Sequence, residues 1–121
     1  MKLLDLTEEV IYEDDELTFV AILCEKQLKL ALKGSKADVI GKIGMKKAGA
    51  LGSLALDHLK RYDKLKAASR RSVVFYARNA QERRTYEKVV KNLLKSKEYK
   101  VVRTFPYAGG ARHWELKKVK A

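Results

Sequence analysis

Cysteine, proline and long hydrophobic runs are nearly absent from this chain of 121 residues. Cys24 is the single cysteine, so the chain forms no internal disulfide and supplies no cysteine-rich zinc module. No stretch of about 18 uncharged apolar residues occurs, which argues against a membrane-spanning helix. The first residues, beginning Met1-Lys2, lack the apolar run of a signal peptide. We therefore expect a cytoplasmic protein in a reducing compartment, with no membrane partner.

Histidine is also scarce, and its scarcity limits the chemistry that we expect. His58 and His113, with one cysteine, are too few for a transition-metal site, and they support no Ser/His/Asp arrangement. The glycines form no phosphate-binding Gly-Lys-Ser/Thr motif. We expect no catalytic residue, no metal and no cofactor, and hence no enzyme. The low content of Gln and Asn beside abundant Lys and Glu is typical of hyperthermophiles, although a basic binding protein would also be rich in Lys. An archaeal or a viral source is compatible with the sequence.

What the chain has in excess is positive charge. It carries 27 Lys and Arg against 15 Asp and Glu, a net charge of +12, and its pI is about 9.8. Residues 1–33 have 4 basic and 8 acidic side chains, whereas residues 34–121 have 23 and 7. The length and the 46% hydrophobic content predict a single folded domain over 1–121, with the acidic and apolar segment 1–33 packed on the basic part. The charge points first to a polyanionic partner.

An acidic cluster stands near the N-terminus. Its default interpretation is a solvated patch, or one that docks against a basic neighbour. The alternative is a divalent-ion site in a nucleic-acid enzyme, although the spacing of a calcium-binding loop is absent. The cluster consists of Glu8, Glu9, Glu13, Asp14, Asp15 and Glu16.

The apolar segment that follows the cluster has two interpretations. As a helix over residues 17–33, it places seven small or apolar side chains on one stripe but leaves four others off it, namely Phe19, Ile22, Leu23 and Leu30. As a strand up to Leu23, it pairs with residues 10–12 across a turn at Asp14 and Asp15. Periodicity alone leaves both open. We expect the helix, which Gly34 would end.

The remainder divides into elements predicted from hydrophobic spacing and turn residues. Ser35 is a candidate cap for the first of them, and the helix after residue 80 has the clearest signal of the chain. The predicted elements are helices over 37–43, 50–66 and 80–96, a strand over 72–77, and hairpin strands over 99–105 and 112–119.

Candidate nucleic-acid-binding residues gather in the second half of the chain. Four cations of the 80–96 helix cluster within about one quarter of its circumference at 100° per residue, opposite its apolar stripe. Phosphates attract such cations. Further basic, aromatic and histidine side chains lie before the helix and in the hairpin loop. The candidates are Arg70, Arg71, Arg78, Arg84, Lys88, Lys91, Lys95, Tyr107, Arg112 and His113. Trp114 and His58 are expected to pack in the core.

The order helix, strand, glycine-containing loop, strand resembles winged helix-turn-helix proteins. The segment from Thr85 to Leu94 matches their recognition helix, and the loop from Tyr107 to Arg112 matches their wing. A second segment, from Val39 to Met45, is similar to a helix-turn-helix through its turn glycine, but the later match carries the cationic face. The resemblance implies an α+β, winged-helix-like domain of helices plus a C-terminal β-hairpin, whose helix enters the major groove.

The sequence therefore predicts a small basic DNA-binding protein, either a regulator or an architectural protein. DNA is favoured over RNA by the resemblance alone. The first alternative is a ribosome-associated or RNA-associated binding protein, since recognition of RNA shape needs no motif. The second is a metal-dependent nucleic-acid enzyme that uses the acidic cluster. For a regulator, the segment from Leu17 to Leu32 is the expected homodimer surface.

Overall fold

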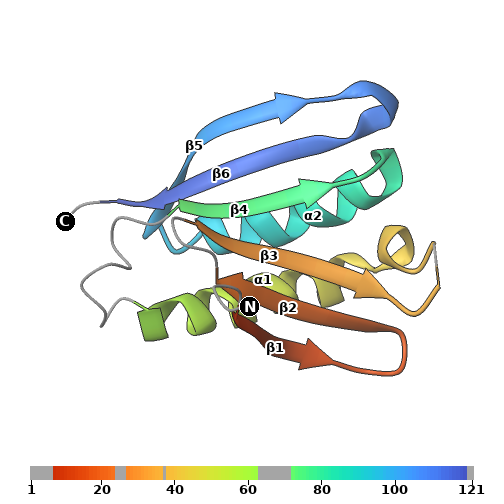
Figure 1. Ribbon diagram of the computed structural model, residues 1–121, viewed down its shortest axis with the longest axis horizontal. Coiled ribbons are helices and arrows are strands. Elements are labelled where there is room, and N and C mark those ends of the chain that lie inside the picture. The colour runs from red at the N-terminus through yellow and green to blue at the C-terminus, as the bar shows by residue number, and fades with distance from the viewer. Residues whose placement is uncertain (1–6, 24–26, 37, 63–71, 120–121) are drawn as a thin grey trace, which may run out of the picture.

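The computed structural model of the protein is built on one six-stranded mixed sheet. The structure describes residues 7–23, 27–36, 38–62 and 72–119. Both helices lie on the same side of the sheet, behind it in Figure 1. The strand order is β1-β2-β3-β4-β6-β5. The elements are β1 (Thr7–Glu13), β2 (Leu17–Leu23), β3 (Gln27–Gly34), α1 (Met45–Tyr62), β4 (Ser72–Ala77), α2 (Ala80–Leu94), β5 (Tyr99–Pro106) and β6 (Arg112–Lys118), with short 3₁₀ helices at Ile40–Lys42 and Ala108–Gly110.

The segment after the acidic cluster is not a helix, so the favoured prediction for 17–33 is wrong. It forms β2 and β3, which continue an antiparallel meander from β1. In β3, buried Leu28, Leu30 and Leu32 alternate with exposed Gln27, Lys29 and Lys33, which is the two-residue period of a strand. The strand interpretation was correct in its details, because Val10 pairs with Val20 across the turn at Asp14.

The winged-helix-like fold is also wrong. The predicted strand at 72–77, the helix that starts at Ala80 and the hairpin of β5 and β6 are all present. However, β4 is a central strand, paired with β3 on one side and β6 on the other. The hairpin therefore continues a large sheet instead of forming a wing beside a helical bundle. The predicted helix 37–43 is reduced to the 3₁₀ turn at Ile40–Lys42, and α1 begins five residues before the predicted start at 50.

The core lies between the sheet and the two helices. Phe19, Leu30 and Phe75 have no exposed surface and come from three neighbouring strands. Leu51 and Val89 cover them from the two helices. β2 and β3 supply central side chains of this core, so these two strands pack in one core with the helices and strands of the basic part. Trp114 and His58 are 6% and 5% exposed, as predicted for packed residues.

The parallel strands β3 and β4 are in register over only four residue pairs, the last being Leu30 with Phe75. Beyond this pair, the backbone N–H and C=O groups of the two strands are no longer paired with each other. The Leu32 backbone N–H donates instead to the Tyr86 hydroxyl of α2, at 2.8 Å. Tyr86 is 2% exposed, so α2 supplies a buried partner at the point where β3 and β4 separate.

Removing this hydroxyl should destabilise the fold. In Tyr86→Phe, the buried Leu32 N–H loses its acceptor, and we expect the free energy of unfolding to fall by about 1–3 kcal/mol. Urea denaturation measures this loss. Tyr107→Phe is the matched control, since Tyr107 is 52% exposed and the same atom is removed. Equal stability of the two variants would show that the bond contributes nothing to folding.

Candidate nucleic-acid interface

The face of the sheet opposite α1 and α2 is covered by no described element (Figure 1). Strand register identifies the side chains that point to it, because those facing the helices belong to the core. A row of side chains, all of them apolar or aromatic apart from His113, crosses this face from β1 to β5. The register pairs in the row are Val10 with Val20, Val20 with Ala31, Tyr76 with His113, and His113 with Phe105.

Four ring-bearing side chains form a cluster at the β4–β6–β5 end of the row, which we call the aromatic patch: Tyr76, Phe105, Tyr107 and His113. Tyr76, Phe105 and Tyr107 are 40%, 46% and 52% exposed. The Tyr107 ring meets the Tyr76 ring edge-on, with centroids 6.1 Å apart, and the Phe105 and His113 rings lie 6.0 Å apart. Large exposed rings held against one another form a surface on which flat ligands can stack.

The loop that carries Tyr107 has a defined conformation. Gly109 and Gly110 have φ values of +75° and +83°, a region that glycine adopts without strain. A Cβ on Gly110 would lie 2.6 Å from the Cβ of Ala80, so the loop packs tightly on the start of α2. The Tyr107 N–H also donates to the Ala111 carbonyl at 2.8 Å. The hairpin loop is thus anchored where it places Tyr107 beside Tyr76.

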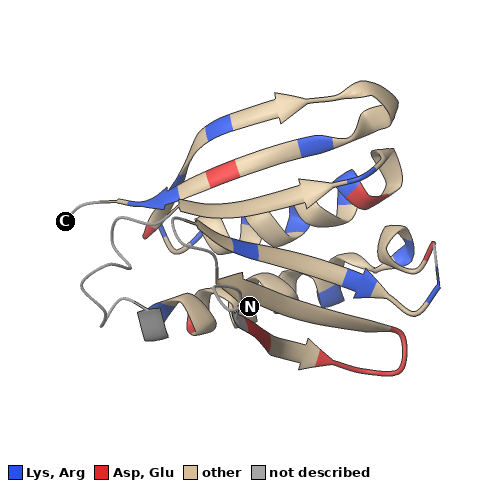
Figure 2. Cartoon of the chain, in the orientation of Figure 1, with Lys and Arg blue, Asp and Glu red and all other residues tan. Residues whose placement is uncertain are grey.

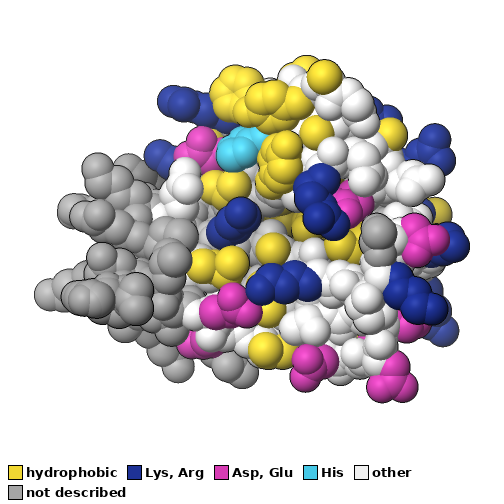
Figure 3. Space-filling model, turned by 45° about the vertical axis from the view of Figure 1, so that its right-hand side comes forward, with side chains coloured by type: hydrophobic (Ala, Val, Ile, Leu, Met, Phe, Trp, Pro, Cys, Tyr) yellow, Lys and Arg dark blue, Asp and Glu magenta, His cyan; other side chains and the backbone are white. Residues whose placement is uncertain are grey.

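Cations lie on the same face of the sheet, on β3, directly after β4 and on β5. We call Lys29, Lys33, Arg78 and Arg103 the sheet cations. Figure 2 shows basic residues along β3 and on the hairpin, whereas acidic residues gather at the β1–β2 turn. Figure 3 shows hydrophobic side chains next to a histidine, with lysine, arginine and acidic side chains elsewhere in the same view. Three carboxylates contact this set: Glu8 lies 3.3 Å from Lys33, Glu82 lies 2.7 Å from Arg78, and Glu115 lies 4.0 Å from Arg103.

Arg78 is the sheet cation whose position is fixed most firmly. Its Nη2 lies 2.7 Å from Glu82 Oε2, and its Nε and backbone N–H also donate to that carboxylate. Glu82 is 3% exposed at the first turn of α2, which Asn79 caps by accepting from the Glu82 N–H at 2.9 Å. The buried carboxylate holds one edge of the guanidinium, while the Arg78 side chain remains 66% exposed.

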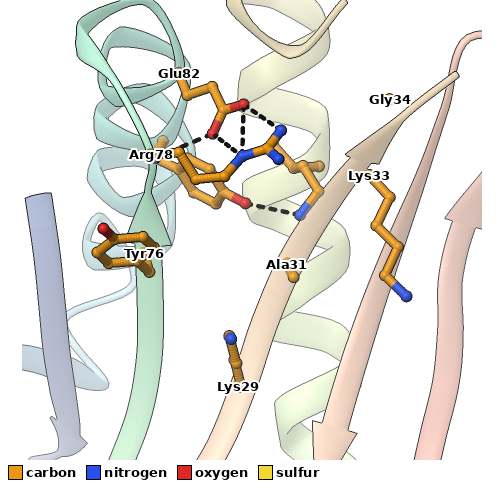
Figure 4. A pocket seen from close by; sticks show the side chains of 9 residues that line it. Lys29, Ala31, Lys33, Gly34, Tyr76, Arg78 and Glu82 are labelled. Atoms are coloured by element: carbon orange, nitrogen blue, oxygen red, sulfur yellow. Dashed lines mark hydrogen bonds and ion pairs between the residues drawn. The ribbon is translucent and has the colours of Figure 1, made fainter. Parts of the chain in front are cut away.

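A pocket of about 290 Å³ opens beside Arg78, between the separating ends of β3 and β4 (Figure 4). Its lining includes Lys29, Tyr76 and Tyr86 as well as the Arg78–Glu82 pair. Lys33 also lines the pocket, and in Figure 4 its side chain extends away from the Arg78–Glu82 pair. Burial raises the pKa of Tyr86 to about 12, so the phenol stays protonated at neutral pH.

The acidic cluster is largely engaged with the protein's own basic groups. Asp14 Oδ2 lies 2.6 Å from Lys47 Nζ and accepts from the Tyr12 hydroxyl, while its Oδ1 accepts from the N–H groups of Glu16 and Leu17. The expectation that the cluster docks against a basic neighbour therefore holds for Asp14, whose ion pair with Lys47 joins the β1–β2 turn to α1. Within the described ranges, no group of three or more His, Cys, Asp or Glu side chains is placed to hold a metal ion.

The Asp14 contacts predict an acid-sensitive stability. Hydrogen bonds from Lys47 and Tyr12 hold the pKa of Asp14 well below its usual range. A carboxyl whose pKa is lower in the folded state stabilises the fold above its unfolded pKa of about 4, and this contribution is lost as the pH falls. We therefore expect Asp14→Asn to lower Tm at pH 7, with the difference from wild type shrinking between pH 4 and pH 2. Thermal unfolding followed by circular dichroism checks this, with Asp15→Asn as control; a difference independent of pH would contradict it.

The predicted cation row of α2 is present on the outer face of the helix. Three of the four side chains are exposed (Arg84, Lys91 and Lys95) and Lys88 is half-buried. The apolar stripe of α2 packs inward. The row therefore lies on the helical side of the protein, away from the aromatic patch. The structure does not bring the four cations together with Tyr107 and His113, which the winged-helix interpretation required.

The other predicted residues divide between the sheet face and the unplaced part of the chain. Tyr107, His113 and Arg78 belong to the uncovered face, whereas Arg112 is half-buried on β6 and donates to the Thr104 hydroxyl. Arg70 and Arg71 lie outside the described residues. A homodimer through Leu17–Leu32 stays a prediction, and only the side chains on the uncovered face remain for it, since the leucines are core residues.

Sequence reasoning missed Lys29, Lys33, Tyr76, Phe105 and the Glu82 anchor. The strand alternation around the two lysines was the signal that could have found them.

None of the helices formed by the described residues is both long and apolar enough to cross a membrane. No protein-family model matches the chain, and comparisons with curated proteins and with solved structures find no match either.

Proposed function

We propose that the protein binds single-stranded nucleic acid on the uncovered face of its sheet, without catalysing a reaction. The observation that carries this proposal is the aromatic patch, in which exposed rings from β4, β5 and the hairpin loop adjoin the sheet cations. The lone cysteine fits a reducing, intracellular setting.

Stacking supports the proposal because Tyr76, Tyr107 and Phe105 expose about half of their surface on one face. Every nucleobase has a flat face, and a base stacked on an aromatic side chain contributes about 1–3 kcal/mol. In duplex DNA the bases are stacked on one another and are not free to do this. The rings therefore favour an unpaired strand as the ligand.

Charge supports the same ligand. Lys29 on β3 and Arg78, directly after the end of β4, line the same pocket as Tyr76, and the net charge of the whole chain is +12. Phosphates of a strand whose bases stack on the patch would release counterions on meeting these cations. The preference for DNA over RNA depended on the winged-helix resemblance, so single-stranded DNA and RNA are both candidates.

Binding of fluorescein-labelled oligonucleotides at one fixed salt concentration tests the proposal. We expect an unstructured DNA or RNA strand of about 12 nucleotides to bind at least about tenfold more tightly than a duplex of the same sequence. Comparing the affinities of the DNA strand and the RNA strand shows whether the protein prefers deoxyribose or ribose. Equal or tighter binding of the duplex would overturn the proposal.

Duplex binding through the α2 cation row is a second candidate, favoured by the alignment of Arg84, Lys88, Lys91 and Lys95 on one outer helix face. Such a row can track a phosphate backbone without reading bases. If this candidate is correct, replacing Lys88 and Lys91 with Glu weakens duplex binding strongly and flattens its salt dependence. Unchanged duplex affinity in that variant would reject it.

A further inference from the structure

The pocket between the ends of β3 and β4 has hydrogen-bond donors without acceptors. The Tyr86 hydroxyl accepts from the Leu32 N–H, but it donates to no described residue. Arg78 uses Nε and Nη2 on Glu82, and its Nη1 has no partner among the described residues. Both groups line the same pocket, and Lys29 completes the set with a cation on β3.

These donors suit an anion. A tyrosine O–H, the free edge of a guanidinium and an ammonium group all donate and, in these roles, none of them accepts. The Glu82 carboxylate also lines the pocket, but it is already engaged by three donors of Arg78 and by no other described side chain. The buried acid therefore fixes the guanidinium so that its remaining N–H groups are available to a ligand.

The position of the pocket indicates which anion it would meet. Tyr76 belongs both to the pocket lining and to the aromatic patch. A base stacked on the Tyr76 ring would have its own phosphate within reach of an opening that the same ring borders. A volume of about 290 Å³ leaves room for a phosphate group and its surrounding water.

We propose that the β3–β4 pocket binds a phosphate group of a nucleotide through Tyr86, Arg78 and Lys29. This inference rests on the proposed function, because it assigns the phosphate to the strand whose base stacks on Tyr76. Glu82 acts through Arg78 and is a positioning residue. The phosphate is either a terminal group or an internal diester of the strand, since both present the oxygen acceptors that these donors match.

Titration of the ¹⁵N-labelled protein with adenosine 5′-monophosphate, and separately with adenosine, tests the pocket by itself. We expect the nucleotide, but not the nucleoside, to shift the backbone amide signals of Leu32 and Arg78. Lys29→Gln should weaken nucleotide binding by about fivefold or more, since it removes one charged donor from an exposed site without touching the core. Lys60→Gln, an exposed site on α1, is the matched control.

Equal shifts from nucleotide and nucleoside, or an unchanged affinity in Lys29→Gln, would overturn the phosphate site. Tyr86→Phe removes the hydroxyl donor and should also weaken nucleotide binding by about fivefold, measured where circular dichroism shows that the variant is folded. Oligonucleotides then separate the two proposals and the two phosphate sources. If strands bind while the nucleotide leaves the pocket signals unchanged, the proposed function stands and the phosphate site is wrong. If the nucleotide binds in the pocket while no strand binds, the phosphate site stands and the proposed function is wrong.

A strand with a 5′-phosphate, the same strand with a 5′-hydroxyl, and one with a single neutral methylphosphonate linkage identify the source. A terminal site predicts weaker binding of the 5′-hydroxyl strand, a difference that disappears in the Lys29→Gln background. An internal site predicts weaker binding of the methylphosphonate strand instead. If neither modification changes affinity for the wild-type protein, the pocket binds no phosphate of the strand and the proposal is wrong.

Discussion

Replacing Tyr76 and Tyr107 together with alanine should reduce the affinity for a single strand by at least about 30-fold. Each ring is available to one base, and loss of a stacked base costs about 1–3 kcal/mol. The two rings touch edge-on at 6.1 Å, so the double substitution removes a continuous part of the aromatic patch. Fluorescence anisotropy with a labelled strand of about 12 nucleotides measures the change.

The matched control keeps the rings and removes only the hydroxyls. Tyr76→Phe/Tyr107→Phe should bind within about threefold of wild type, because stacking depends on the ring face. Both side chains are exposed by 40% or more, so neither double variant should lose its fold, which far-ultraviolet circular dichroism checks. If the alanine variant binds as tightly as the phenylalanine variant, stacking on these rings does not carry the interaction.

Reversing the charge of Lys29 and Lys33 should produce the second large reduction in affinity. Both lysines point to the uncovered face from β3, and each is exposed. We expect Lys29→Glu/Lys33→Glu to lower single-strand affinity by about 50-fold. The dependence of log K on log salt should become shallower by about 1.4, because each phosphate that a lysine no longer neutralises reduces the slope by about 0.7.

An equal change of net charge elsewhere separates local binding from overall attraction. Lys46→Glu/Lys60→Glu reverses two exposed lysines on α1, behind the sheet. Exposed charges more than about 10 Å apart are largely screened at 0.1 M salt, so this control should weaken binding by no more than about threefold. Similar reductions in the two double variants would mean that the protein attracts nucleic acid only through its net charge.

The second half of the fold was predictable because its local signals agree with its final structure. The 80–96 prediction succeeded since Tyr86, Val89 and Leu93 repeat at helical spacing and Asn79 caps the first turn. The segment 17–33 failed for the opposite reason. Its first strand is buried at Phe19, Val20 and Ala21 in succession, so the two-residue period that distinguishes a strand is missing there.

The candidate site was less predictable than the fold because long-range pairing creates it. Lys29 and Tyr76 are far apart in the chain and line one pocket only because β3 and β4 pair in parallel. Local patterns identified Tyr107 and His113, which lie on a hairpin. They could not show that the α2 row and the hairpin residues belong to different sides of the protein. That distinction depends on strand order, which no local pattern specifies.

The most direct test of the account is a chemical-shift map of a bound single strand. In ¹H–¹⁵N spectra, addition of an unstructured strand should move the signals of β3, β4 and the β5–β6 hairpin, with Tyr76, Tyr107 and Lys29 among the largest changes. The signals of the outer face of α2, including Lys91 and Lys95, should stay nearly unmoved. Shifts confined to α2, with the uncovered sheet face unchanged, would contradict the account.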